Sequence, residues 1–167
     1  CHLQPEPSNA IRDAVRRYAR RKGLAFFNFR QQSGFLRNLI IRNSSNGNVM
    51  VIVVFFLDEK ARRDALLDFL SSEFSQITSL WYIINTKRND SLTDQLPVLY
   101  KGDDHLEEEI DGLKFRIGPN SFYQTNTGQA SKLYRIVRDF AGLTGNEIVY
   151  DLYTGTGTIA NYVAASA

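Results

Sequence analysis

The sequence predicts an α+β domain over residues 1–118, followed by the incomplete opening of an α/β, Rossmann-like unit over residues 119–167. Three observations support this fold class. Apolar, β-branched runs alternate with amphipathic segments as far as residue 118. A strand signal runs directly into a glycine-containing turn near residue 155. Only one strand and about one and a half helices follow residue 119, which is too little to bury a doubly wound sheet.

The first domain is expected to begin with a helix from about Asn9 to Lys22, capped by Ser8 and ended by Gly23. Its buried stripe consists of Ile11, Ala14, Val15 and Tyr18. Further along, a helix is expected over residues 58–72, and strands over residues 35–42, 48–57, 80–86, 97–101, 106–110 and 113–117. Asn46-Gly47 and Asp111-Gly112 are typical of hairpin turns between consecutive strands.

The second unit is expected to hold a helix over residues 127–141, a strand over residues 147–152 and the start of another helix near Thr158. Ala130, Leu133, Val137 and Phe140 lie at helical spacing along the first of these helices. A lone strand leaves its backbone groups unpaired, so self-association through residues 147–152 is expected.

Bulk composition favours a folded protein in a reducing, cytoplasmic environment. Hydrophobic residues make up 43% and charged residues 23% of the chain, enough for a packed core. No apolar run approaches the ~20 residues that a membrane-spanning helix needs. The N-terminus has no initiator methionine and no secretory signal, and is expected to be an internal cut. The single cysteine cannot form an internal disulfide.

Positive charge is concentrated near the N-terminus. Residues 1–42 contain nine Lys and Arg against two acidic residues, although the whole chain has a net charge of only +2. The expected first helix carries much of this charge, on Arg12, Arg16, Arg17, Arg20 and Arg21. These arginines would suit RNA phosphates, and the Phe26, Phe27 and Phe29 that follow could stack on unpaired bases. A solvated helix face followed by a core strand is the alternative.

The turn from Asp151 to Thr158 has the residues of a nucleotide-cofactor site. Gly155-x-Gly157-x-x-Ala160 satisfies a dinucleotide-binding pattern. Asp151, four residues before Gly155, makes the segment resemble the first motif of class I methyltransferases, and this resemblance implies S-adenosylmethionine as the cofactor. An ordinary strand-to-helix turn is the third possibility.

A more specific pattern precedes this turn, Gly118-Pro119-Asn120-Ser121-Phe122-Tyr123-Gln124-Thr125-Asn126-Thr127. Together with residues 113–117 it resembles the RNA uracil-5-methyltransferase family, whose members methylate C5 of a uridine in ribosomal or transfer RNA. The resemblance extends over essentially the whole chain. It implies cofactor contacts from Gln124 and Tyr153. Thr158 falls where some members have a cofactor-contacting Asn. The expected cofactor-binding set is Gln124, Asp151, Tyr153, Gly155, Gly157 and Thr158.

The resemblance also implies a covalent mechanism, in which a cysteine thiolate adds to C6 of uracil and a general base later removes the C5 proton. Both groups are implied to lie downstream, so no catalytic residue is expected here, and the isolated chain is expected to be inactive. Cys1 matches an iron–sulfur ligand position of some members, but its three companion ligands are not in this chain. No cluster or other metal is therefore expected. The Cys1–Pro5 segment favours the branch acting on 23S ribosomal RNA.

Two other functions stay open at this point, a stand-alone RNA-binding module and a fragment of a nicotinamide-dependent oxidoreductase. The acidic run Glu107-Glu108-Glu109 is expected to be a solvated strand edge, with no role at a site.

Overall fold

Strand β2 (Val49–Phe55) lies at the centre of the fold. Its sequence, VMVIVVF, contains four valines and an isoleucine, which suit a pleated surface, and all seven residues are buried. A strand buried on both faces requires a packed layer on each side of its sheet. The computed structural model describes residues 3–167 and shows both layers.

The central sheet has the order β1-β2-β3-β4, with β1 (Leu36–Asn43), β3 (Ile77–Ile84) and β4 (Val98–Gly102) beside β2. β1 and β2 are antiparallel and form the expected hairpin, in which Gly47 has a φ of 86°. β2 and β3 are parallel, so helix α2 (Lys60–Glu73) makes the crossover between them. β4 pairs antiparallel with β3.

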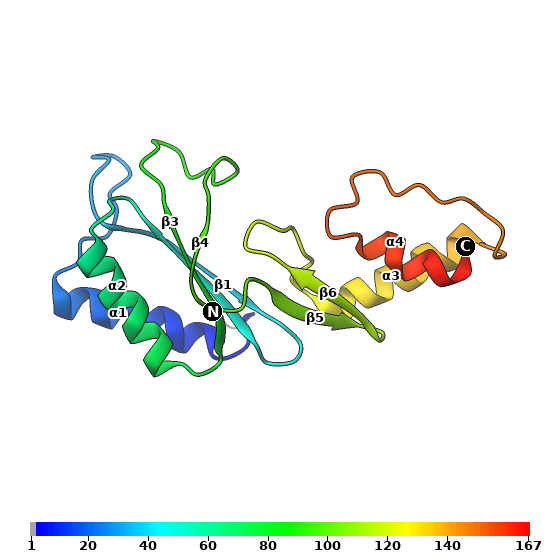
Figure 1. Ribbon diagram of the computed structural model, residues 1–167, viewed down its shortest axis with the longest axis horizontal. Helices are drawn as coiled ribbons and strands as arrows, with labels where there is room; N and C mark the ends of the chain where they lie inside the picture. Colours follow the sequence, from blue (N-terminus) through cyan, green and yellow to red (C-terminus); the bar gives the residue numbers. More distant parts are fainter. Residues whose placement is uncertain (1–2) are drawn as a thin grey trace.

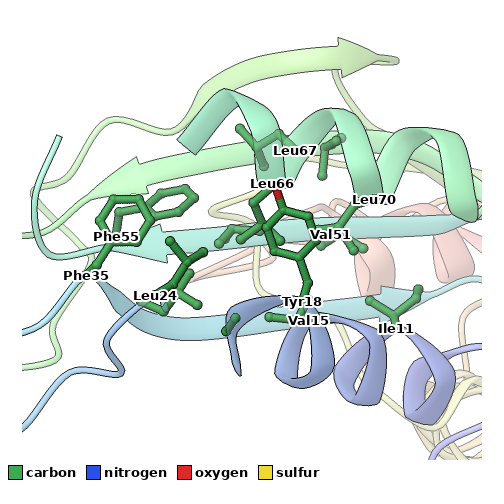
Figure 2. Packing of buried hydrophobic residues seen from close by; sticks show 14 of the residues in the cluster. Ile11, Val15, Tyr18, Leu24, Phe35, Val51, Phe55, Leu66, Leu67 and Leu70 are labelled. Atoms are coloured by element: carbon green, nitrogen blue, oxygen red, sulfur yellow. The ribbon is translucent and has the colours of Figure 1, made fainter. Parts of the chain in front are cut away.

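Helices α1 (Ser8–Lys22) and α2 cover one face of this sheet. Val51 and Phe55 of β2 point toward this face, where α1 contributes Ile11, Val15 and Tyr18 and α2 contributes Leu66, Leu67 and Leu70 (Figure 2). The Tyr18 ring stacks on Phe69 of α2 with 4.7 Å between ring centroids. The predicted apolar stripe of the first helix is therefore confirmed.

The hairpin of β5 (Leu106–Ile110) and β6 (Leu113–Ile117) joins the two parts of the molecule. Leu106 and Ile117 pack against the second face of the central sheet. Ile110 and Phe115, at the other end of the hairpin, pack against α3 (Thr127–Ala141) and α4 (Thr158–Val163). Figure 1 shows α3 and α4 beyond the hairpin, away from α1 and α2. A short 3-10 helix, η1 (Ala164–Ser166), ends the chain.

Two expectations about single elements are wrong. Ser8 lies inside the first turn of α1 rather than capping it, and its hydroxyl accepts a hydrogen bond from the Asn43 side chain at 2.7 Å. Residues 147–152 form no strand, because no strand within residues 3–167 lies beside them to share backbone hydrogen bonds. Of the apolar residues at helical spacing on α3, Ala130 is buried together with Tyr134, whereas Leu133 and Phe140 are exposed.

No helix within residues 3–167 combines the length and the apolar character needed to cross a membrane.

Candidate functional site

A hollow of about 220 Å³ lies between the segment that leads into α3 and the glycine turn that leads into α4. Gln124, Asp151, Tyr153, Gly155 and Thr158 line it, so the fold brings together five of the six residues expected at a cofactor site. The sixth, Gly157, is not part of the lining. The remaining lining residues are Phe122, Tyr123, Leu133, Tyr134, Leu152, Thr154, Thr156 and Ile159.

The glycine turn adopts an unusual backbone conformation. Tyr153, Gly155 and Gly157 have φ values of 62°, 56° and 72°. This left-handed region suits glycine, but a bulky side chain there is strained. Tyr153 is nevertheless held in it with its side chain fully exposed at the hollow. A Cβ at Gly155 would meet nothing within 4 Å, whereas one at Gly157 would lie 3.0 Å from the Asn161 amide nitrogen. Gly157, directly before α4, therefore allows the Asn161 side chain to pack closely against the start of the helix.

Asp151 holds the turn together. Its Oδ2 accepts hydrogen bonds from the Thr154 hydroxyl at 3.0 Å and from the Ala160 backbone N–H at 3.1 Å. Ala160 lies in the first turn of α4, where backbone N–H groups have no partner within the helix. The carboxylate therefore caps α4 and fixes the intervening turn. Within residues 3–167 both hydrogen bonds to this carboxylate use Oδ2, so Oδ1 is available to a ligand.

Gln124 is exposed at the opposite wall of the hollow. The helix-capping role that could have explained a polar residue here belongs to its neighbour Asn126, whose side chain accepts from the Gln129 N–H at 3.0 Å. Upstream, the Arg42 guanidinium of β1 donates to the carbonyls of Gly118 and Ser121 at 3.2 and 2.7 Å. The segment that carries Gln124 is thus anchored to the central sheet.

Tyr134 is a buried residue that also lines the hollow, and burial raises the pKa of its hydroxyl. Its ring lies 5.7 Å from that of Tyr162. The Tyr162 hydroxyl donates to Asp111, which also accepts from Arg135 at 2.7 Å and from Ser131 at 2.9 Å. The Arg135 guanidinium holds the pKa of Asp111 well below its usual range. The hairpin turn therefore fastens α3 and α4 together, a role that its Asp-Gly sequence did not indicate.

Glu108 contradicts the expectation of a solvated acidic edge. It is only 2% exposed, and its carboxylate accepts from the Ser45 N–H at 3.0 Å, from the Ser45 hydroxyl and from the Thr127 hydroxyl at 3.3 Å. Strand alternation places it on the inward face, between Leu106 and Ile110. The Tyr123 hydroxyl is buried and has no hydrogen-bond partner among residues 3–167, and burial together with the charge of Glu108 raises its pKa.

Helix α1, which carries the arginines, lies at the opposite end of the molecule from α3 and α4 (Figure 1), which border the hollow. Arg16, Arg17 and Arg20 are exposed and form no ion pair within residues 3–167. Arg12 pairs with Asp13 at 3.0 Å, and Arg21 lies over the Tyr18 ring at 5.7 Å. The helix therefore presents a positively charged outer face.

Cys1, the residue that matches an iron–sulfur ligand position, lies outside the described residues. Across residues 3–167, no group of three or more His, Cys, Asp or Glu side chains is placed to hold a metal ion.

The sequence is similar to bacterial proteins that are named as RNA methyltransferases. One from Porphyromonas gingivalis, called an uncharacterized RNA methyltransferase, is 56% identical over 169 residues, covering 100% of this chain and 36% of the relative. Its counterpart from Bacteroides thetaiotaomicron is 55% identical, with 100% and 37% covered. The chain thus spans little more than a third of the length of the curated relatives it matches. No family model matches the chain.

The fold is similar to a solved structure as well. The crystal structure of Pyrococcus abyssi tRNA (uracil-54, C5)-methyltransferase in complex with S-adenosyl-L-homocysteine superimposes with a TM-score of 0.70 at 25% identity. The match covers 92% of this chain and 36% of that protein. Sequence and fold agree: over its whole length the chain is similar to a part of proteins that are named RNA methyltransferases.

Proposed function

We propose that this chain is part of an S-adenosylmethionine-dependent methyltransferase that acts on C5 of uridine in RNA. One observation carries the proposal: Gln124, Asp151, Tyr153, Gly155 and Thr158 converge on a single hollow in a chain whose relatives are named RNA methyltransferases. Residues 1–118 would form a central, RNA-facing domain, and residues 119–167 the beginning of the methyltransferase domain.

The residues around the hollow suit this cofactor, which carries a nucleoside and an amino acid but no phosphate. Gly155 allows a ligand to approach the backbone closely. Asp151 Oδ1 and the Gln124 amide can hydrogen-bond its polar groups, while the Tyr153 ring can pack on its flat surface. At about 220 Å³, the hollow is smaller than the ~300–1,000 Å³ of typical ligand pockets. This chain would therefore supply one wall of a larger pocket.

When bound, the cofactor supplies an electrophilic methyl group. C5 of uracil is a poor nucleophile, and addition of a thiolate to C6 would make it reactive, after which a base removes the C5 proton. Cys1 is the only cysteine of this chain. We therefore place the nucleophile and the base outside it and infer that residues 1–167 alone do not transfer methyl groups.

Arg12, Arg16, Arg17, Arg20 and Arg21 of α1 would contact RNA phosphates. Such contacts position the nucleic acid without reading its sequence. We favour ribosomal RNA of the 23S type as the substrate and the cytoplasm as the compartment. The structural neighbour acts on tRNA by its name, which makes tRNA the competing substrate.

The test is methyl transfer by the complete protein with labelled S-adenosylmethionine and uridine-containing RNA. We expect label at C5 of uridine, and none with residues 1–167 alone. Gln124→Ala should weaken cofactor affinity roughly tenfold, the value of one good hydrogen bond. Gln129→Ala, at an exposed glutamine in the first turn of α3 that does not line the hollow, should leave it unchanged. Methylation of another base, or binding of a nicotinamide cofactor instead, would contradict the proposal.

A further inference from the structure

Two long loops extend from the same end of the central sheet, far from the hollow. Residues 23–35 lead into β1, and residues 85–97 follow β3. Both lie at the carboxyl ends of the parallel strands β2 and β3, because β1 runs antiparallel to them (Figure 1). In open α/β sheets, ligands bind outside this edge.

Arg37 fixes the two loops to each other. Its side chain is almost completely buried and donates to the carbonyls of Asn85, Lys87 and Asn89 at 2.8, 2.6 and 2.6 Å. The same guanidinium pairs with Asp90 and lies 4.3 Å from the centre of the Phe27 ring. Backbone carbonyls of one loop and an aromatic ring of the other therefore share one buried cation, which orders both loops in advance of any ligand.

The first loop is also ordered internally. The Asn28 side chain accepts from the N–H groups of Arg30 and Gln31 at 3.0 and 3.1 Å, and its backbone pairs with that of Ser33. Gly34 has a φ of 128°, and a Cβ there would lie 2.6 Å from the Phe26 carbonyl oxygen. The chain turns back tightly at this point, where only glycine fits.

Two phenylalanine side chains of the first loop are exposed to solvent. Phe26 is 52% and Phe29 59% exposed. Arg30 and Arg88 are exposed nearby in the two loops and form no ion pair within the described part of the chain, whereas Lys87 is paired with Asp94 and Arg37 with Asp90. We call the surface made by Phe26, Phe29, Arg30 and Arg88 the loop platform.

We propose that the loop platform binds unpaired RNA, with Phe26 and Phe29 stacking on bases and Arg30 and Arg88 contacting phosphates. The inference deepens the proposed function, on which it rests, by naming the form of RNA that the central domain recognises. Stacking requires bases that are not already paired and is tolerant of sequence. The charge of +7 over residues 1–42 matches a polyanion rather than an apolar protein surface.

The test compares binding of residues 1–167 to a labelled oligouridine strand and to an RNA duplex, by fluorescence anisotropy across a salt series. The double variant Phe26→Ala/Phe29→Ala should lose about tenfold or more in affinity for the single strand, since each stack is worth roughly tenfold. Its affinity for the duplex and its salt dependence should stay unchanged. Arg30→Gln/Arg88→Gln should instead lower the slope of log affinity against log salt by about 1.4, or about 0.7 per phosphate contact.

Phe140→Ala is the matched control, because Phe140 is 89% exposed on α3, at the other end of the molecule. The variant Phe26→Leu/Phe29→Leu keeps the apolar bulk without the aromatic faces and should show the same loss, which guards against a folding defect. Single-strand affinity that is unchanged, or that falls by the same factor as duplex affinity, would overturn the inference. If the complete protein still methylates RNA in that case, only the loop platform is refuted. If it neither binds nor methylates RNA, the proposed function fails.

Discussion

At the scale of single residues, Glu108 joins three segments that are distant in sequence. It lies on β5 and accepts hydrogen bonds from Ser45, in the turn between β1 and β2, and from Thr127, at the start of α3. A buried carboxylate is tolerated only when such donors compensate its lost hydration. Glu108 thus links the central sheet to the helix that borders the hollow.

We expect Glu108→Ala to lower the free energy of unfolding by about 1–3 kcal/mol, because the charge-assisted hydrogen bonds from Ser45 and Thr127, which join three segments of the chain, would be lost. Glu109→Ala, at the next and exposed position, should change it by less than about 0.5 kcal/mol. Urea denaturation of both variants measures the difference. Equal effects of the two substitutions would show that burial of Glu108 contributes nothing specific.

The sequence contains a signal for the burial of Glu108 but none for its hydrogen-bond partners. Apolar residues at 106 and 110 predict an inward face, and the alternation of a strand places Glu108 on it. Its hydrogen-bond partners come from residues 63 and 19 positions away, which no local pattern identifies. Arg37 is similar, because its four partners lie about 50 residues further along the chain.

At the scale of secondary structure, local patterns predicted the elements whose backbone hydrogen-bond partners are nearby in the sequence. The helix over residues 127–141 and the hairpin around Asp111-Gly112 are confirmed. The expected strand over residues 147–152 is absent, since a strand depends on hydrogen bonds to a neighbouring chain segment. Five of the six residues expected at a cofactor site line the hollow, whereas the contribution of Tyr134 depends on packing between helices, which no local pattern indicates.

The glycine turn depends on Asp151 as a helix cap. Asp151→Ala removes the acceptor for the Ala160 N–H, so α4 should lose about 1 kcal/mol of local stability. Amide hydrogen exchange at Ala160 and Asn161 should become several-fold faster, whereas Asp139→Ala, an exposed carboxylate at the end of α3, should leave these amides unchanged. Undiminished protection in the Asp151 variant would mean that packing of Tyr162 alone holds α4.

At the scale of the whole molecule, apolar surface is distributed unevenly. Most apolar side chains of the central sheet and of its two helices are buried. The region after residue 121 instead exposes a set of large apolar side chains, namely Phe122, Leu133, Ile136, Phe140, Ile148, Val149, Tyr150, Leu152, Tyr153 and Ile159. Exposed apolar surface of this kind is typical of an interface, and Leu133, Ile136 and Phe140 lie at helical spacing along α3. Self-association, first expected through a strand edge, is now better attributed to these side chains.

We therefore expect residues 1–167 to associate as concentration rises, with the contact on the exposed side of α3. The variant Leu133→Ser/Ile136→Ser/Phe140→Ser should shift the population to monomer in sedimentation velocity, because it removes apolar area without touching the buried Tyr134. Leu96→Ser, at an exposed leucine in the loop before β4, should not alter the distribution. A wild-type chain that stays monomeric at every concentration would contradict self-association through this face of α3.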